Sequence, residues 1–307
     1  MTDDLRQEYG EALGLTILSL DPIQENKYCA IFLAQTPAGP RIVKKYRGED
    51  PAMAREEAHA LDFYHELATA DPDLLDSGRS LLREDRNLLC IGFVEGNPMS
   101  DVLYRARRDP VLQERLVRIM GVLGRVLRTI YDKTGAPGEG TSPFIFEYMD
   151  YCSRRLEKAP VVSLFFRGLQ KEAESLWTEL EDAGITPSFV HGDFVFKNIH
   201  VQGDRVGLID FANTNPRSHP LNDIYNLRMA LSNMVLPTAF KRSLLANLYD
   251  GFGGVSFPAG AHHFYYEYHR RRWLMLKLLS GGIRARIQGI RGLITFARPF
   301  TEDVITP

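Results

Sequence analysis

The residues best suited to do chemistry are two aspartates and an asparagine: Asp193, Asn198 and Asp210. Asn198 follows Asp193 by five residues, and Asp210 follows Asn198 by twelve. An amide oxygen and a carboxylate oxygen are hard ligands that suit Mg²⁺, an ion that keeps several waters and also binds substrate phosphates. An acid outside that pair can accept a proton from a hydroxyl group. These groups therefore meet the needs of phosphoryl transfer from a nucleotide to an alcohol.

Short apolar runs place these side chains at the ends of strands or turns. The runs Ile199–Val201 and Val206–Ile209 flank a turn and predict a β-hairpin, which would return Asp210 close to Asn198. An alternative interpretation is a strand, a turn and a second strand whose polar residues only cap the turns. A metal-dependent hydrolase is a further alternative, but it would need more ligands clustered nearby.

A lysine and a glutamate near the start of the chain support the phosphoryl-transfer interpretation. Lys44 lies at the end of the apolar run Pro40–Tyr46, where its ammonium group can reach phosphate oxygens. Glu57 lies on the predicted helix Ala52–Leu67 and can pair with that lysine and hold it extended. The alternative for a lysine at a strand edge is a solvated charge.

Two stretches, VHGDFVFKNI at 190–199 and GLIDF at 207–211, resemble the catalytic region of a known family. This is the aminoglycoside phosphotransferase and choline kinase-like family, whose members are distant relatives of the protein kinases. The resemblance implies that Asp193 is the catalytic base. It also implies that Asn198 and Asp210 are the ligands of Mg²⁺.

The resemblance covers about residues 15–235 and assigns roles near the start of the chain as well. It favours Lys44 over Lys45, because the family has an apolar pair followed by lysine. It favours Glu57 over Glu56, because the acid of the family directly precedes alanine. Each of these two choices leaves the neighbouring residue as the alternative.

The segment Leu89–Gly96 resembles the family's connector between lobes, where backbone groups bind adenine. The resemblance therefore implies adenine contacts near Ile91 and Phe93. The implied cofactors are ATP, with GTP as an alternative, and Mg²⁺. The predicted loop Asp21–Asn26 contains no glycine, although glycine normally allows a backbone to approach phosphates closely. Anchoring of phosphate by this loop therefore stays open.

The resemblance also implies roles for two residues around the catalytic segment. His191 would be an architectural residue of the catalytic loop. Asp223, in the motif Pro220-Leu-Asn-Asp, would brace that loop through hydrogen bonds. Taken alone, Asp223 is equally suited to cap the helix that follows, and both roles are compatible.

The distribution of apolar residues predicts an α+β protein. Strands are expected at Leu15–Leu20, Tyr28–Ala34, Pro40–Tyr46 and Leu88–Phe93, with turn-forming Asp21-Pro22 after the first. Long helices are expected at Asp101–Tyr131, Ser163–Ala183, Asn222–Met234, Ala239–Asp250 and Ala261–Phe296. The prediction is a two-lobed, protein-kinase-like fold. Residues 1–95 would form a small antiparallel-sheet lobe that binds nucleotide, and residues 96–307 a mostly helical lobe that carries the catalytic and acceptor sites.

Composition excludes several other classes of protein. The 307 residues include 37 Lys and Arg against 39 Asp and Glu, so the net charge of −2 argues against a nucleic-acid binder. The longest apolar runs are strand-sized, which predicts no transmembrane segment, and the acidic start does not resemble a secretory signal. The three cysteines, Cys29, Cys90 and Cys152, show no paired spacing. A reduced, cytoplasmic protein is expected.

A basic stripe bears on the acceptor of the phosphoryl group. Residues 260–300 include eight basic residues and one acid. Five of the basic residues recur every seventh position: Arg270, Lys277, Arg284, Arg291 and Arg298. The stripe suits an anionic acceptor or an anionic lipid surface. The alternative is a solvated helix face with snorkelling arginines.

The sequence thus predicts a kinase acting on a small-molecule hydroxyl of the sugar, amino-alcohol or envelope-precursor type. A polycationic aminoglycoside is not expected, because it would need an acidic pocket. Acceptor specificity is expected at Phe144–Lys158 and on the C-terminal helices. The rival hypothesis is a non-catalytic module that keeps the fold and regulates a partner. A protein-substrate kinase is a third possibility, but Asp223 follows Phe211 too closely to leave room for an activation loop.

Overall fold

The computed structural model describes most of the chain. The described residues are 2–136 and 178–280, apart from 27, 49, 254 and 255, together with 172, 175 and 176. The expected specificity segment Phe144–Lys158, most of the predicted helix Ser163–Ala183, and Arg284, Arg291 and Arg298 of the basic stripe lie outside the described residues. Among the described residues, no helix combines the length and apolar character that a membrane span requires.

The chain divides into two compact units that do not follow the chain order simply. Unit 1 comprises Met1–Val102 and Phe196–Thr214, and unit 2 comprises Leu103–Val195 and Asn215–Pro307. The hairpin predicted between Asn198 and Asp210 therefore belongs to the same unit as the N-terminal sheet. The assignment of functional lobes to 1–95 and 96–307 stays a prediction.

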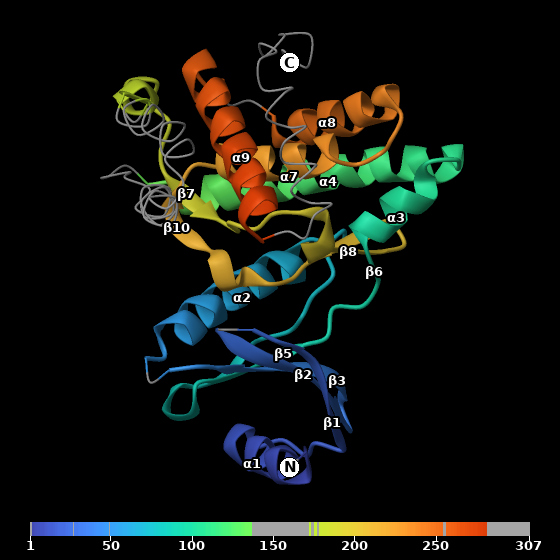
Figure 1. Cartoon of the computed structure of the whole chain (residues 1–307), viewed down its shortest axis with the longest axis vertical. Coiled ribbons are helices and arrows are strands. Elements are labelled where there is room, and N and C mark those ends of the chain that lie inside the picture. The colour runs from blue at the N-terminus through green and yellow to red at the C-terminus, as the bar shows by residue number, and fades with distance from the viewer. Residues whose placement is uncertain are drawn as a thin grey trace. The chain divides into compact units, whose positions relative to one another are not determined.

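Unit 1 contains a five-stranded antiparallel sheet in the order β1-β2-β3-β5-β4 (Figure 1). Its strands are β1 (Ser19–Glu25), β2 (Cys29–Thr36), β3 (Gly39–Tyr46), β4 (Leu81–Arg83) and β5 (Leu88–Gly92). The predicted second and third strands and the predicted strand Leu88–Phe93 are confirmed to within two residues at each end.

The first predicted strand is wrong in position. The sequence places it at Leu15–Leu20 with a turn at Asp21-Pro22, whereas β1 begins at Ser19 and runs through both turn residues to Glu25. β1 is an edge strand, where a proline removes no necessary ladder hydrogen bond. The pairing with β2 shifts register between Pro22 and Gln24, which accommodates the proline.

A helix absent from the prediction precedes the sheet. Helix α1 (Thr2–Leu13) buries Tyr9 and Leu13 in a core with Phe32 and Val43 of the sheet. The Tyr9 and Phe32 rings meet edge to face with centroids 5.8 Å apart. Leu5, Tyr9 and Leu13 recur every fourth residue, so they share one helical face, and this spacing could have identified the helix.

Helix α2 (Ala52–Ala70) lies against the same sheet (Figure 1). It brings a carboxylate into the interior. Its buried face includes Ala54, Glu57, Ala58 and Leu61, which recur at helical spacing. Because the apolar residues commit this face to the core, Glu57 is buried with them.

The predicted hairpin is confirmed and forms a small second sheet in unit 1. Strand β8 (Ile199–Gln202) pairs antiparallel with β9 (Arg205–Leu208) and with the short β6 (Asn97–Pro98). Gly96, with φ of +109°, precedes β6, and a Cβ there would lie 2.7 Å from the Val201 carbonyl oxygen. Only glycine allows the segment before β6 to approach β8 this closely.

The described part of unit 2 is mostly helical. Its described helices include α4 (Pro110–Thr134), α7 (Leu221–Ser232), α8 (Thr238–Phe252) and α9 (Ala259–Ser280), with a two-stranded sheet of β7 (Ser188–Val190) and β10 (Asn215–Ser218). Helix α3 (Met99–Ala106) begins in unit 1 and ends in unit 2.

The single helix predicted over Asp101–Tyr131 is two helices, α3 and α4. Asp109 caps α4 by accepting a hydrogen bond from the Leu112 N–H at 3.0 Å, and Pro110 occupies the first helical turn. An acidic cap followed by proline is a common start of a helix. The Asp-Pro pair could therefore have located this break from sequence.

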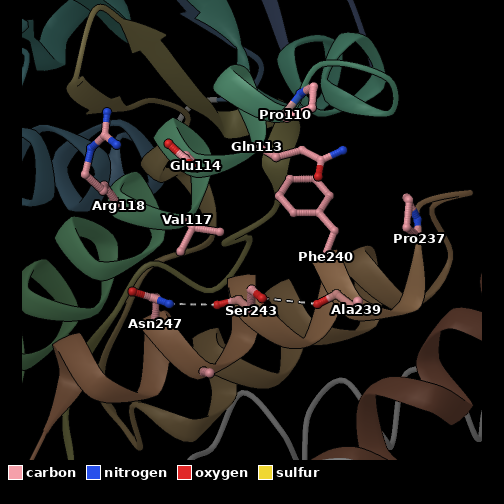
Figure 2. Close-up of a pocket in the computed structure, with 11 residues that line it drawn as sticks. Pro110, Gln113, Glu114, Val117, Arg118, Pro237, Ala239, Phe240, Ser243 and Asn247 are labelled. Carbon is pink, nitrogen blue, oxygen red and sulfur yellow. Dashed lines mark hydrogen bonds between the residues drawn. The ribbon is translucent and has the colours of Figure 1, made fainter.

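Helices α4 and α8 pack closely at one end and diverge at the other. At the close end a Cβ on Gly124 would lie 2.2 Å from the Leu248 carbonyl oxygen. At the other end the helices leave a groove of about 760 Å³, where the Phe240 ring of α8 reaches toward Gln113 of α4 (Figure 2). The groove lies within unit 2, and its lining contains no residue of the predicted active site.

Candidate active site

A buried ion pair lies at the centre of the site in unit 1. The Lys44 Nζ, on β3, donates to Glu57 Oε1 on α2 at 2.7 Å. Lys44 is 4% exposed and Glu57 is fully buried. The Lys44 ammonium also donates to Asp210 Oδ1 at 3.2 Å, and the Asp210 side chain is 39% exposed. The structure therefore brings three of the predicted site residues into direct contact within one unit.

Burial raises the pKa of the Glu57 carboxyl, and the contacts of the carboxylate act against that shift by favouring its charged form. Its Oε1 accepts from Lys44, its Oε2 accepts from the Tyr46 hydroxyl, and it also accepts from the backbone N–H of Phe211. Burial by itself lowers the pKa of Lys44, but the carboxylates of Glu57 and Asp210 outweigh burial, so the pKa of Lys44 is raised. The lysine thus keeps its positive charge in the interior, as a phosphate ligand must.

Lys45 and Glu56, the alternatives that the sequence left to Lys44 and Glu57, do not take part in the buried pair. Lys45 points to the other face of β3, where its Nζ donates to the Arg86 carbonyl oxygen near the surface. Glu56 is exposed on α2. Lys44 and Glu57 therefore form the buried pair, and a shift of one residue along either element would break it.

The hairpin determines where Asn198 and Asp210 lie in unit 1. The two residues flank the strands β8 and β9, and the Ile209 N–H donates to the Asn198 carbonyl oxygen at 3.0 Å, which continues the ladder to the base of the hairpin. Asp210 has φ 65° and ψ 64°, a left-handed conformation that is uncommon outside glycine. Such strained backbone is frequent at functional sites.

The chemistry of these two side chains fits Mg²⁺. An amide oxygen and a carboxylate oxygen are the hard ligands that this ion takes, with water and phosphate completing its octahedron. Among the described residues, no group of three or more His, Cys, Asp or Glu side chains has the spacing of a metal site. Asn198 is 5% exposed, whereas Asp210 is open enough to meet a ligand.

The proposed adenine-contact segment is tied to the same hairpin. Ile91 is buried at the end of β5, and Phe93 is 39% exposed just beyond it. The His200 Nδ1 of β8 lies 3.0 Å from the Val94 carbonyl oxygen, and β6 continues the contact by strand pairing. The segment after β5 and the hairpin that carries Asn198 therefore form one connected structure.

The turn between β1 and β2 satisfies its own backbone groups. The Asn26 side-chain oxygen accepts from the backbone N–H of Tyr28 at 2.7 Å and from that of Cys29 at 2.9 Å. The Asn26 N–H in turn donates to the Cys29 carbonyl oxygen at 3.0 Å. The predicted loop Asp21–Asn26 is wrong for all but its last residue, because Asp21–Glu25 belongs to β1. In the turn that follows, the Asn26 side chain occupies two N–H groups that could otherwise face an anion.

In unit 2, the segment before Asp193 is fixed by a buried carboxylate. Asp223, on α7, accepts from the backbone N–H of His191 at 2.7 Å and from that of Gly192 at 2.9 Å. Burial raises the pKa of Asp223 to about 7, and the nearby Asp193 carboxylate adds to the increase. Asp223 therefore braces this loop, and it does not cap α7, whose N-cap is Pro220.

A family model supplies the identification. The model described as "Phosphotransferase enzyme family" matches residues 29–272. The chain belongs to this phosphotransferase family. The match includes every residue to which the sequence assigned a site role, from Lys44 to Asp223.

Solved structures agree on the fold of this phosphotransferase. It is similar to a thermostable mutant of aminoglycoside phosphotransferase APH(4)-Ia, in complex with ADP and hygromycin B, with 14% identity, a TM-score of 0.63 and coverage of 97% of this chain and 100% of that one. A choline kinase, LicA from Streptococcus pneumoniae, is 16% identical, with a TM-score of 0.59 and coverage of 95% of this chain and 99% of that one. A putative fructosamine-3-kinase from Thermobifida fusca is 16% identical, with a TM-score of 0.59 and coverage of 96% of this chain and 99% of that one. The predicted α+β, protein-kinase-like fold is confirmed. A search of curated protein sequences gave no match.

The basic stripe of the phosphotransferase is partly neutralised where the structure describes it. Glu267 lies 2.8 Å from Arg270 and 3.5 Å from Arg271, and both arginine side chains are 15% exposed. Lys277 lies over the Trp273 ring at 5.7 Å. Arg270 is therefore held in an ion pair and contributes less to an open basic surface than the sequence spacing predicts.

The sequence assigned no site role to Tyr46 of the phosphotransferase, and it left the contribution of the loop that ends at Asn26 open. Tyr46 contacts Glu57, and Asn26 occupies the amides of the β1–β2 turn. Tyr46 lies two residues after Lys44, so it shares its face of β3, and this spacing was available in the sequence. The role of Asn26 depends on a local turn that the sequence does not show.

Proposed function

We propose that this phosphotransferase moves the γ-phosphate of ATP to a hydroxyl group of a small molecule in a Mg²⁺-dependent reaction. The observation that carries the proposal is the buried Lys44–Glu57 pair, with Asp210 3.2 Å from the lysine at the base of the hairpin that also carries Asn198. A fully buried, charged pair is costly unless its geometry serves a purpose. The pair also contacts Asp210, a partly exposed carboxylate that can hold Mg²⁺ for the nucleotide phosphates.

Each residue has a distinct part in this proposal. Lys44, steadied by Glu57, binds phosphate oxygens and offsets their negative charge. Asn198 and Asp210 hold Mg²⁺, which neutralises phosphate charge when bound. Asp193 accepts the proton of the acceptor hydroxyl and orients its oxygen for in-line attack. Backbone groups near Ile91 and Phe93 bind the base of ATP, with GTP as the alternative nucleotide.

The acceptor we propose is a sugar, an amino-alcohol or an envelope precursor. The proteins similar in fold include a choline kinase and a putative fructosamine-3-kinase, which are named for two such hydroxyl compounds. We do not expect an aminoglycoside, because residues 260–300 carry eight basic residues and one acid and would repel a polycation. The pairing of Glu267 with Arg270 and Arg271 reduces this repulsion without reversing its sign. A cytoplasmic location and the absence of a nucleic-acid partner stay predictions.

Replacement of the base tests the proposal. We expect Asp193→Ala to keep the rise in melting temperature that Mg·ATP produces but to abolish phosphoryl transfer in a screen of hydroxylated metabolites for ADP release. Asp182→Ala is the matched control, because Asp182 is an exposed aspartate of the same unit. Full turnover by Asp193→Ala would remove Asp193 from the mechanism.

One observation favours the rival function, a non-catalytic binding module. The Asn26 side chain occupies two amides of the β1–β2 turn, so this turn offers less to phosphate than a glycine-rich loop does. A thermal-shift titration separates the two functions. A melting temperature that rises with ATP only when Mg²⁺ is present supports the kinase, and the absence of any response supports the module.

A further inference from the structure

The Tyr46 hydroxyl group makes a contact that the proposed reaction does not yet use. Tyr46 is 3% exposed, and its hydroxyl donates to Glu57 Oε2, while the other carboxylate oxygen, Oε1, accepts from Lys44 at 2.7 Å. Lys44 and Tyr46 are two residues apart on β3, so both side chains lie on one face of the strand. One carboxylate therefore receives two donors from the same strand, one on each oxygen.

These two contacts, together with the backbone N–H of Phe211, fix the rotation of the carboxylate. The last torsion of a glutamate side chain is soft, with broad and roughly two-fold minima, so a single hydrogen bond leaves the group able to turn. With one oxygen held by Tyr46, the other is directed at Lys44. Glu57 is fully buried, so water is not at hand to replace a lost donor.

The rotation matters because Lys44 lies between two carboxylates. Its Nζ is 2.7 Å from Glu57 and 3.2 Å from Asp210. If Glu57 turns away, the ammonium group moves toward Asp210, because a buried cation needs a partner. That movement would take Lys44 away from the phosphates and would neutralise a carboxylate that we assign to Mg²⁺.

We propose that Tyr46 is a positioning residue for nucleotide binding. Its hydroxyl fixes the Glu57 carboxylate, and the carboxylate prevents Lys44 from moving closer to Asp210. Tyr46 itself touches neither substrate nor metal. This inference rests on the proposed function for its nucleotide readout, although the underlying side-chain arrangement is testable without nucleotide.

The test compares two tyrosine-to-phenylalanine variants, each of which removes only a hydroxyl group. We expect Tyr46→Phe to raise the dissociation constant for Mg·ATP, measured by calorimetry, about ten- to a hundredfold, because a displaced Lys44 loses its hydrogen bond to a charged phosphate oxygen. Tyr9→Phe is the matched control, because Tyr9 is an equally buried tyrosine of unit 1 that packs on Phe32. An unchanged constant for Tyr46→Phe would overturn the proposal.

A double-mutant cycle shows whether Tyr46 acts through Glu57. In a Glu57→Gln background, Tyr46→Phe should change the Mg·ATP dissociation constant by less than about twofold, because the carboxylate it orients is gone. A merely structural tyrosine would cost the same in both backgrounds. Equal effects in the two backgrounds would therefore overturn the positioning role.

The reactivity of Lys44 gives a readout that does not need nucleotide. Acetylation by an N-hydroxysuccinimide ester, followed by mass spectrometry of the Lys44 peptide, should be severalfold faster in Tyr46→Phe than in the wild-type chain or Tyr9→Phe. The reason is that a lysine that has moved toward the partly exposed Asp210 is more accessible to the reagent. A wild-type chain that fails to bind Mg·ATP would refute the proposed function and leave this measurement valid. Equal acetylation rates in all three chains would overturn the role of Tyr46.

Discussion

Asp223→Asn should remove a pH-dependent part of the stability of the protein. Asp223 is buried, and its carboxyl pKa is raised from 3.8 to about 7, first by burial and then by the nearby Asp193 charge, against the hydrogen bonds from His191 and Gly192. Arg272 also faces this carboxyl and acts in the opposite direction to Asp193. The asparagine variant cannot ionise at this position, and its side-chain oxygen still accepts a hydrogen bond from the loop.

The sign and size of the effect follow from the two pKa values. Between about pH 4 and 7 the folded state holds a proton on Asp223 that the unfolded chain has lost, so the folded state loses stability as the pH rises. The loss is about 1.4 kcal/mol per pH unit within that window. From about pH 5 to 6.5, the wild-type free energy of unfolding should therefore fall by about 2 kcal/mol relative to the variant.

Urea denaturation of both chains across that pH range measures the difference directly. His219 and His269 have pKa values lowered by burial, so they add stability as the pH rises, and the comparison between chains removes their contribution. Asp182→Asn, at an exposed position, is the control and should show a constant difference from the wild-type chain. If the difference between Asp223→Asn and the wild-type chain is also constant with pH, the carboxyl pKa of Asp223 is not raised into this range.

Two further substitutions test the turn and the helix pair. Asn26→Ala frees two backbone N–H groups of the β1–β2 turn. We therefore expect the Mg·ATP dissociation constant to fall severalfold and the free energy of unfolding to fall by about 1 kcal/mol. Weaker nucleotide binding by this variant in calorimetry would contradict the role given to the turn. Gly124→Ala places a Cβ 2.2 Å from the Leu248 carbonyl oxygen, and the forced separation of α4 and α8 should cost about 1–3 kcal/mol in urea denaturation. Gly121→Ala, whose Cβ would meet its nearest neighbour at 3.7 Å, is the control, and equal losses at the two positions would contradict the close-packing argument.

The hairpin and the buried pair were accessible from sequence because they depend on short-range patterns. Two apolar runs around a turn fix the pairing of β8 with β9, and the ends of the hairpin then bring Asn198 and Asp210 near each other. Only the family pattern favoured Lys44 over Lys45. The structure adds the physical reason, because side chains alternate across a strand and Lys44, not Lys45, contacts Glu57 on α2.

The first part of the sheet was harder to predict because context overrides local preference there. Asp21-Pro22 has the composition of a turn, yet it forms part of β1, since an edge strand tolerates a residue that cannot donate. Helix α1 was missed although its local pattern was present. Its apolar spacing was present at Leu5, Tyr9 and Leu13, but it becomes decisive only with the sheet surface that the helix covers.

The contacts of Tyr46 and Asn26 show the limit of pattern reasoning about a site. Tyr46 has the apolar ring expected of a core residue, and only its long-range contact with Glu57 gives the hydroxyl group a role. Asn26 bonds to amides two and three residues ahead, a choice that depends on the local turn and not on residue type alone. Neither contact changes the polarity pattern from which the elements were predicted.

The composition of unit 1 has a consequence for how the protein is made. Residues 1–102 leave the ribosome long before residues 196–214, yet both belong to this unit. A nascent chain that stops at residue 102 already contains Lys44 and Glu57 but still lacks Asp210 and the hairpin. Vectorial folding therefore cannot finish the proposed nucleotide-binding unit until residues 196–214 have been translated.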